Sequence, residues 1–143
     1  MTTRHKGPIA CIAISAFSGW SSLVLAFAGW TFLWPHGPGF APEIGPFATF
    51  IVFTLVFSGF FFCDVFLIIV PAHFILRAGH VRLLPWQTSL LGAGSFVLSV
   101  PVWSALSRHL VVGDLLFCSV LAAIAGTVSF YVLGRTSPTS KAA

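Results

Sequence analysis

The sequence predicts an all-α, multi-pass membrane protein in which four transmembrane helices form an up-down bundle, with both termini in the cytoplasm. The first observation behind this prediction is composition. Of 143 residues, 57% are apolar and only 7% are charged, and the mean hydropathy is +1.00. Soluble domains carry about 25% charged residues, so a soluble fold of this size would lack the polar side chains that cover a core. The whole chain, residues 1–143, is therefore expected to form one integral membrane domain.

The second observation is that four apolar runs are each long enough to cross a bilayer. About 20 predominantly apolar residues in a helix cross roughly 30 Å of hydrocarbon. The expected spans are residues 9–33, 47–76, 84–106 and 110–133, with an outer loop (34–46), a cytoplasmic loop (77–83) and a cytoplasmic tail (134–143).

The third observation is the distribution of Lys and Arg around these runs, which decides orientation because positive loops stay on the cytoplasmic side. Only Arg108 lies on the opposite side from the other cations, which are Arg4, Lys6, Arg77, Arg82, Arg135 and Lys141. Both termini are therefore expected inside. Interface aromatics agree: Trp30, Trp34 and Trp103 fall at the predicted outer boundary, and Trp86 and Tyr131 fall at the inner one.

The first run, residues 9–33, contains no charged residue. Because Arg4 and Lys6 precede it and the small-residue stretch 26–29 falls inside it, a cleaved signal peptide is an alternative interpretation. The apolar part is longer than a usual signal-peptide core, which favours a retained span. Small residues four apart, as in Ser15 and Gly19, predict close approach to another helix.

The outer loop, residues 34–46, holds four prolines and three glycines and is not expected to be helical. One interpretation is a plain connector. The other is a contact surface for a partner, because apolar side chains would be displayed on a non-helical backbone at the water boundary. The residues of this candidate surface are Phe40, Glu43, Ile44 and Phe47.

The second run, residues 47–76, is longer than a span requires and carries nine phenylalanines and one acid, Asp64, near the predicted bilayer midplane. A carboxylate there costs about 2.5 to 3.5 kcal/mol on insertion scales. Each Phe, Ile, Leu or Val contributes roughly 0.3 to 0.6 kcal/mol of favourable insertion free energy on the same scale, so insertion of the helix is favourable despite Asp64.

Two roles are open for Asp64. It can be a proton- or cation-coupled site, or an acid that pairs with a basic residue of a partner protein inside the membrane. Alternatively, it makes a structural interhelical hydrogen bond to a hydroxyl group. No basic residue of the chain lies at the same depth, which favours a proton or an external partner. The candidate hydroxyl partners are Ser15, Ser18, Ser21, Ser22, Ser95, Ser99 and Ser119.

His73 follows Asp64 by nine residues, which on a straight helix turns the side chain to the opposite face, so the two are not expected to form a dyad. Pro71 leaves the carbonyl of Leu67 without a donor and predicts a kink. His73 lies near the inner boundary, where an imidazole needs no special role. The alternative is that it belongs to an intramembrane polar site.

The third run, residues 84–106, is interrupted by Pro101, and the fourth, residues 110–133, carries Asp114 near its start. An acid near a helix N-terminus is stabilised by the helix dipole and can pair with Arg108 across the tight turn. The alternative is that Asp114 is the outermost polar group of a series of polar groups that leads through the membrane to Asp64.

Several functional classes lack their required residues in the sequence. Cys11, Cys63 and Cys118 have no paired spacing, which argues against a disulfide scaffold, a zinc site and a dithiol redox site. No catalytic triad or phosphate-binding pattern occurs, and the cations do not cluster as nucleic-acid binding requires. No enzyme activity, cofactor or metal is therefore expected.

The sequence favours a small, non-enzymatic accessory subunit or interaction protein of a bacterial inner membrane, a class that includes toxin-immunity proteins. Its expected partners are the lipid bilayer and either another membrane protein or a second copy of the chain. The alternative function is a small oligomeric transporter or channel, coupled to protons or cations, that uses Asp64.

Overall fold

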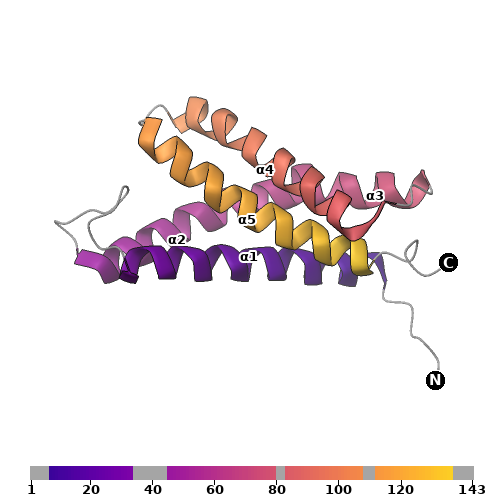
Figure 1. Ribbon diagram of the computed structural model, residues 1–143, viewed down its shortest axis with the longest axis horizontal. Coiled ribbons are helices and arrows are strands. Elements are labelled where there is room, and N and C mark those ends of the chain that lie inside the picture. The colour runs from indigo at the N-terminus through magenta and orange to yellow at the C-terminus, as the bar shows by residue number, and fades with distance from the viewer. Residues whose placement is uncertain (1–6, 34–44, 80–82, 108–111, 137–143) are drawn as a thin grey trace, which may run out of the picture.

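The computed structural model describes residues 7–33, 45–79, 83–107 and 112–136, with the backbone alone for residues 107 and 112–114. These residues are almost entirely helical, as predicted (Figure 1). The elements are α1 (Pro8–Leu33), α2 (Gly45–Asp64), the π-helical turn η1 (Val65–Ile69), α3 (Val70–Ala78), α4 (Pro85–Ser107) and α5 (Val112–Thr136).

Four of the described helical stretches are long and apolar enough to cross a membrane, which confirms the predicted number of candidate spans. The second candidate combines α2, η1 and α3 into one stretch, Gly45–Ala78. The others lie within α1, α4 and α5.

The helix starts follow from proline and capping chemistry. Proline suits the first turn of a helix because its fixed φ is already helical and the N–H that it lacks has no partner there. Pro8 and Pro85 begin α1 and α4, and Pro46 follows Gly45 at the start of α2. The amide of Leu84 donates to Oε1 of Gln87 at 2.9 Å, which satisfies a free donor at the start of α4.

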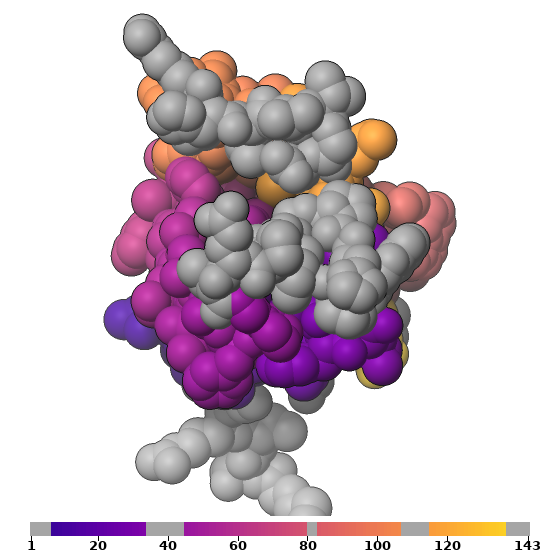
Figure 2. Space-filling model, turned by 90° about the vertical axis from the view of Figure 1, so that its left-hand side faces the viewer, coloured from indigo at the N-terminus to yellow at the C-terminus, as the bar shows by residue number. Residues whose placement is uncertain are grey.

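Helix α5 packs on both α4 and α1, and α1 packs on α2 (Figure 1). Contacts near both ends show that α1 and α5 are antiparallel, because Cys11 Sγ lies 3.4 Å from the carbonyl oxygen of Thr136 and the rings of Phe27 and Phe117 lie 6.0 Å apart. Figure 2 views the molecule from the left-hand side of Figure 1, where the end of α1 lies beside the start of α2. By contrast, α2 and α4 approach each other at few points.

Small residues permit the closest helix crossings. A Cβ atom on Gly126 of α5 would lie 2.4 Å from the carbonyl oxygen of Gly92 on α4, and one on Gly19 of α1 would meet the Ser129 hydroxyl of α5. The prediction that Ser15 and Gly19 lie on a closely packed face is therefore confirmed, since Ser15 also donates to the carbonyl of Ser129.

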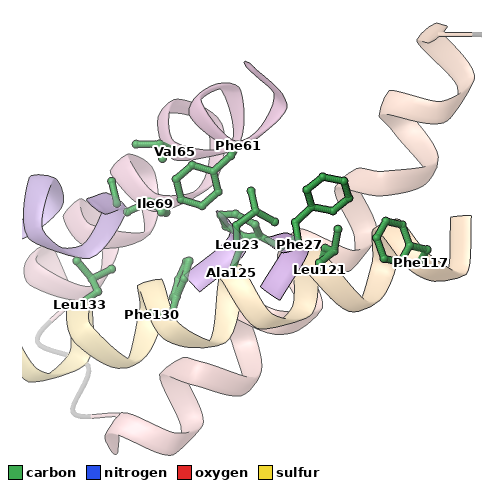
Figure 3. Packing of buried hydrophobic residues seen from close by; sticks show 12 residues of the cluster. Leu23, Phe27, Phe61, Val65, Ile69, Phe117, Leu121, Ala125, Phe130 and Leu133 are labelled. Atoms are coloured by element: carbon green, nitrogen blue, oxygen red, sulfur yellow. The ribbon is translucent and has the colours of Figure 1, made fainter. Parts of the chain in front are cut away.

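The buried core lies between α1, α5, α4 and the second span. Figure 3 shows side chains from α1 and α5 lying against one another, with residues of α2 and η1 directed toward them. Within this core, the ring of Phe27 contacts phenylalanine rings of α2 and α5. Members of the cluster include Leu23, Phe27, Phe61, Val65, Ile69, Phe117, Leu121, Ala125, Phe130 and Leu133.

The phenylalanine-rich helix α2 is peripheral. Only Thr49, Phe61 and Asp64 are fully buried in it, and many of its large apolar side chains are exposed on the surface of the molecule. Such exposure is stable in lipid, because apolar side chains gain little by moving from acyl chains to a protein interior.

A π-helical turn interrupts the second span directly after Asp64. In η1 the amide of Val70 donates to the carbonyl of Val65, five residues earlier, and Pro71 follows without an N–H group of its own. Figure 1 shows the span changing direction between α2 and α3. The irregularity predicted from Pro71 therefore takes the form of a π-turn, a feature common at functional sites.

Candidate functional site

Asp64 is the last residue of α2, and its buried carboxyl group bridges to α4. Oδ2 lies 2.8 Å from the Ser99 hydroxyl, and Oδ1 accepts a hydrogen bond of 3.1 Å from Nε1 of Trp103. Ser99 and Trp103 are four residues apart and therefore share one face of α4. The two hydrogen bonds link α2 and α4 where their backbones otherwise make few approaches.

The hydrogen-bond geometry of Ser99 accommodates both protonation states of Asp64. The Ser99 oxygen lies 2.8 Å from Asp64 Oδ2 and 2.7 Å from the carbonyl oxygen of Phe96, yet a hydroxyl has a single proton to donate. If Asp64 is ionised, Ser99 donates to it. If Asp64 is protonated, its O–H donates to Ser99, and Ser99 donates to Phe96. The indole N–H of Trp103 donates to Oδ1 in both states.

Asp64 also lines a cavity of about 430 Å³ between α1, α2, α4 and α5. This volume falls in the range of about 300–1,000 Å³ that is typical of small-molecule sites. The only polar side chains among the described lining residues are Asp64, Ser99, Trp103 and Cys118. Aromatic rings form much of the wall, namely Phe53, Phe57, Phe60, Phe61, Phe96 and Phe117 together with Trp103.

The cavity wall arises from helical periodicity. On α4 the lining residues Phe96, Ser99, Val100 and Trp103 follow the i, i+3, i+4, i+7 pattern of one helix face. On α2 the lining residues Phe57, Phe60, Phe61 and Asp64 follow the same pattern. The carboxyl group and its two donors are therefore presented by two helix faces that confront each other across the cavity.

His73 is not part of this site. Its side chain is buried, with 1% exposure, and neither ring nitrogen has a hydrogen-bond partner within the described part of the chain. His73 does not line the Asp64 cavity, and its ring lies near that of Phe74.

The candidate contact surface is described only at Phe47. Its side chain is exposed, but it belongs to the first turn of α2 instead of the expected non-helical backbone. Gly45, with φ of 75°, makes the turn into the helix and Pro46 suits its first turn. Phe40, Glu43 and Ile44 lie outside the described residues, as does the side chain of Asp114; the backbone of Asp114 lies in the first turn of α5.

Sequence reasoning missed Trp103 as a partner of Asp64. The sequence predicts this residue at the outer membrane boundary, where Trp is common. The structure turns its indole toward Asp64 and places its ring 5.1 Å from that of Phe60. The spacing of four residues between Ser99 and Trp103 was the available signal, since it places two donors on one helix face.

Among the residues that the structure describes, no group of three metal-ligating side chains comes together. Comparison of the chain with models of protein families, with curated proteins and with solved structures finds no match.

Proposed function

We propose that this chain is a small, non-enzymatic transporter or channel of a bacterial inner membrane that takes up a proton or a cation at Asp64. The single observation that supports this function best is that the Asp64 carboxyl group lines a cavity of about 430 Å³. Asp64 is buried, both of its hydrogen-bond partners lie on α4, and the residue also belongs to the lining of this cavity. A bound ion could therefore lie beside the acid without separation of α2 from α4.

The surroundings of Asp64 suit reversible proton uptake. Burial in an apolar environment disfavours an isolated carboxylate, and the donors Ser99 and Trp103 offset part of this cost. When a proton binds to Oδ2, the Ser99 hydroxyl turns to the Phe96 carbonyl, so no polar atom of this group loses its partner. Protonation therefore requires rotation of one hydroxyl group and no movement of a helix.

We further propose an up-down bundle with both termini in the cytoplasm. The excess of Lys and Arg in the loops and tails that are expected inside supports this orientation. The start of α1 and the end of α5 lie at the same end of the molecule, which is compatible with it (Figure 1).

Proton flux into liposomes tests the proposed function. The full-length protein is reconstituted with pyranine trapped inside, and flux is driven by an acid jump while valinomycin and potassium balance the charge. We expect protein-dependent flux that falls to the protein-free level in Asp64→Asn. Asparagine can accept from Trp103 and donate to Ser99, so this variant removes the titrating group and keeps both helix contacts.

The matched control for this assay is Ser95→Ala. Ser95 lies one turn before Ser99 on α4, bonds to the carbonyl of Leu91 in its own helix, and does not line the cavity. Its flux should equal that of the unaltered protein. Proton flux that persists in Asp64→Asn would contradict the proposed function, as would the absence of flux above protein-free liposomes under both a proton gradient and a cation gradient.

An accessory or interaction protein is the second candidate function. The observation that favours it is an exposed apolar stripe on α2, formed by Phe47, Ile51, Leu55 and Phe62, which helical spacing places on one face. Mass measurement after purification in mild detergent would then detect a bound partner or a second copy, and substitutions in the stripe would release it without any effect on flux.

A further inference from the structure

The wall of the Asp64 cavity has the chemistry of a site for an organic cation. Aromatic faces attract cations through the ring quadrupole, and quaternary ammonium groups are commonly bound in this way. Seven of the described lining side chains are aromatic, and they come from α2, α4 and α5. Two ring pairs within this wall join α2 to α4, namely Phe60 with Trp103 at 5.1 Å and Phe61 with Phe96 at 5.7 Å.

The charged groups that line the cavity favour a ligand with a single positive charge. Among the described lining residues Asp64 is the one acid, and none is Lys, Arg or His. The other titratable lining group is the thiol of Cys118 on α5, while the described lining residues of α1 and α4 contribute none. A site with one carboxylate attracts a single positive charge and repels anions.

The shortage of oxygen ligands argues against a bare metal ion. Calcium takes six to eight oxygen ligands, and magnesium requires octahedral oxygen coordination. The side chains that line the cavity offer the two carboxyl oxygens of Asp64 and the hydroxyl of Ser99, and the rest of the wall is aromatic, aliphatic or thiol. A cation that carries its own apolar groups needs no such ligands, and it fills the apolar volume that a metal ion would leave empty.

We propose that the cavity binds a lipophilic organic monocation, which exchanges with a proton at Asp64. This inference rests on the proposed function and names its substrate class. In the exchange, the cation pairs with the carboxylate while the O–H bond of the Asp64 acid breaks and releases its proton to water. One positive charge therefore replaces another, and the net charge of the occupied cavity stays constant.

Binding of two ions of the same shape and opposite charge tests the inference. Tetraphenylphosphonium and tetraphenylborate each carry four phenyl rings, so they share apolar area and differ in charge. Calorimetric titration of the full-length protein in detergent should show binding of tetraphenylphosphonium and at least about tenfold weaker binding of tetraphenylborate, which corresponds to about 1.4 kcal/mol. Equal affinity for the two ions would show that the cavity binds them through apolar contacts without regard to charge, and it would overturn the inference.

Proton release provides a second readout. In weak buffer at low pH, where Asp64 is protonated, tetraphenylphosphonium should release up to one proton for each cation bound, and its affinity should rise with pH as the competing proton is lost. Asp64→Asn should release no proton and bind at least about tenfold more weakly, whereas Ser95→Ala should behave as the unaltered protein. The pH dependence of the unaltered protein tests the exchange even if Asp64→Asn fails to fold; affinity that is independent of pH would contradict it.

The two proposals fail in different ways. Binding of tetraphenylphosphonium with proton release, but without proton flux in liposomes under either a proton gradient or a tetraphenylphosphonium gradient, would support the ligand class and contradict a transport function. Proton flux that depends on Asp64, in a protein that does not prefer tetraphenylphosphonium to tetraphenylborate, would support the transport function and overturn the ligand class.

Discussion

At the scale of single residues, Asp64 combines a structural contact with access to a cavity. Its two carboxyl oxygens contact donors on α4, and Ser99 can act as donor or acceptor toward it because Phe96 offers an alternative acceptor. Of the serines that the sequence offered as partners, packing selects Ser99. The carboxyl group therefore joins two helices whose backbones approach each other at few points, and it does so in either protonation state.

Removal of the Ser99 hydroxyl should weaken the link between α2 and α4. We expect Ser99→Ala to lower the free energy of unfolding by about 0.6 kcal/mol and at most about 1.7 kcal/mol, the range measured for interhelical hydrogen bonds in membranes. Unfolding by SDS in mixed micelles, followed by circular dichroism, measures this change.

Ser95→Ala is the matched control for stability, since among the described residues the Ser95 hydroxyl has its hydrogen bond within α4, to the carbonyl of Leu91. If Ser99→Ala and Ser95→Ala unfold at the same SDS concentration, the hydrogen bond from Ser99 to Asp64 does not stabilise the bundle.

At the scale of helices, small residues decide which faces meet. In lipid there is little hydrophobic drive between helices, so close packing and polar contacts determine the arrangement. Gly92 and Gly126 bring α4 and α5 into close contact, and Gly19 does the same for α1 and α5. Helix α2 lacks such a close crossing and lies at the periphery, where its few contacts with α4 leave space for the cavity.

An added methyl group at the α4–α5 crossing should separate these helices. In Gly126→Ala the new Cβ atom would lie 2.4 Å from a backbone oxygen of Gly92, so we expect destabilisation by about 1 to 3 kcal/mol, as for other overpacked sites. SDS unfolding in mixed micelles measures it.

Gly94→Ala provides the contrast, because nothing lies within 4 Å of a Cβ atom at that position of α4. Alanine favours a helix over glycine by up to about 1 kcal/mol, so this variant should be at least as stable as the unaltered protein. A Gly126→Ala protein as stable as Gly94→Ala would show that α4 and α5 are not closely packed there.

At the scale of the whole molecule, the cations around the candidate spans and the cavity between the helices have different proposed roles. Six of the seven cations are expected on one side of the membrane and orient the bundle. Among the residues with described side chains, the interior instead holds one acid, Asp64, which lines the cavity. The proposed orientation thus depends on cations in the loops, the tails and the last turns of α3 and α5, while the proposed activity depends on the helix faces.

Reporter fusions test the proposed orientation. Alkaline phosphatase is active only outside the cytoplasm, and green fluorescent protein exported in unfolded form does not fluoresce there. We expect a phosphatase fused after residue 40 to be active, and fluorescent protein fused after residue 143 to fluoresce. An inactive phosphatase after residue 40, together with an active one after residue 143, would reverse the orientation.

The four candidate spans and the acid within the second of them could be predicted from composition, because insertion of a helix into a bilayer depends on transfer free energies that add residue by residue. Tertiary packing, in contrast, sets the neighbours of Asp64, the burial of His73 and the peripheral position of α2. When a helix is apolar on all sides, its sequence does not indicate which face is buried against other helices. That choice depends on close crossings at glycines and on paired polar groups such as Asp64 with Ser99 and Trp103. The cavity at Asp64 follows from the same packing, since it lies where α2 and α4 confront each other without such a crossing.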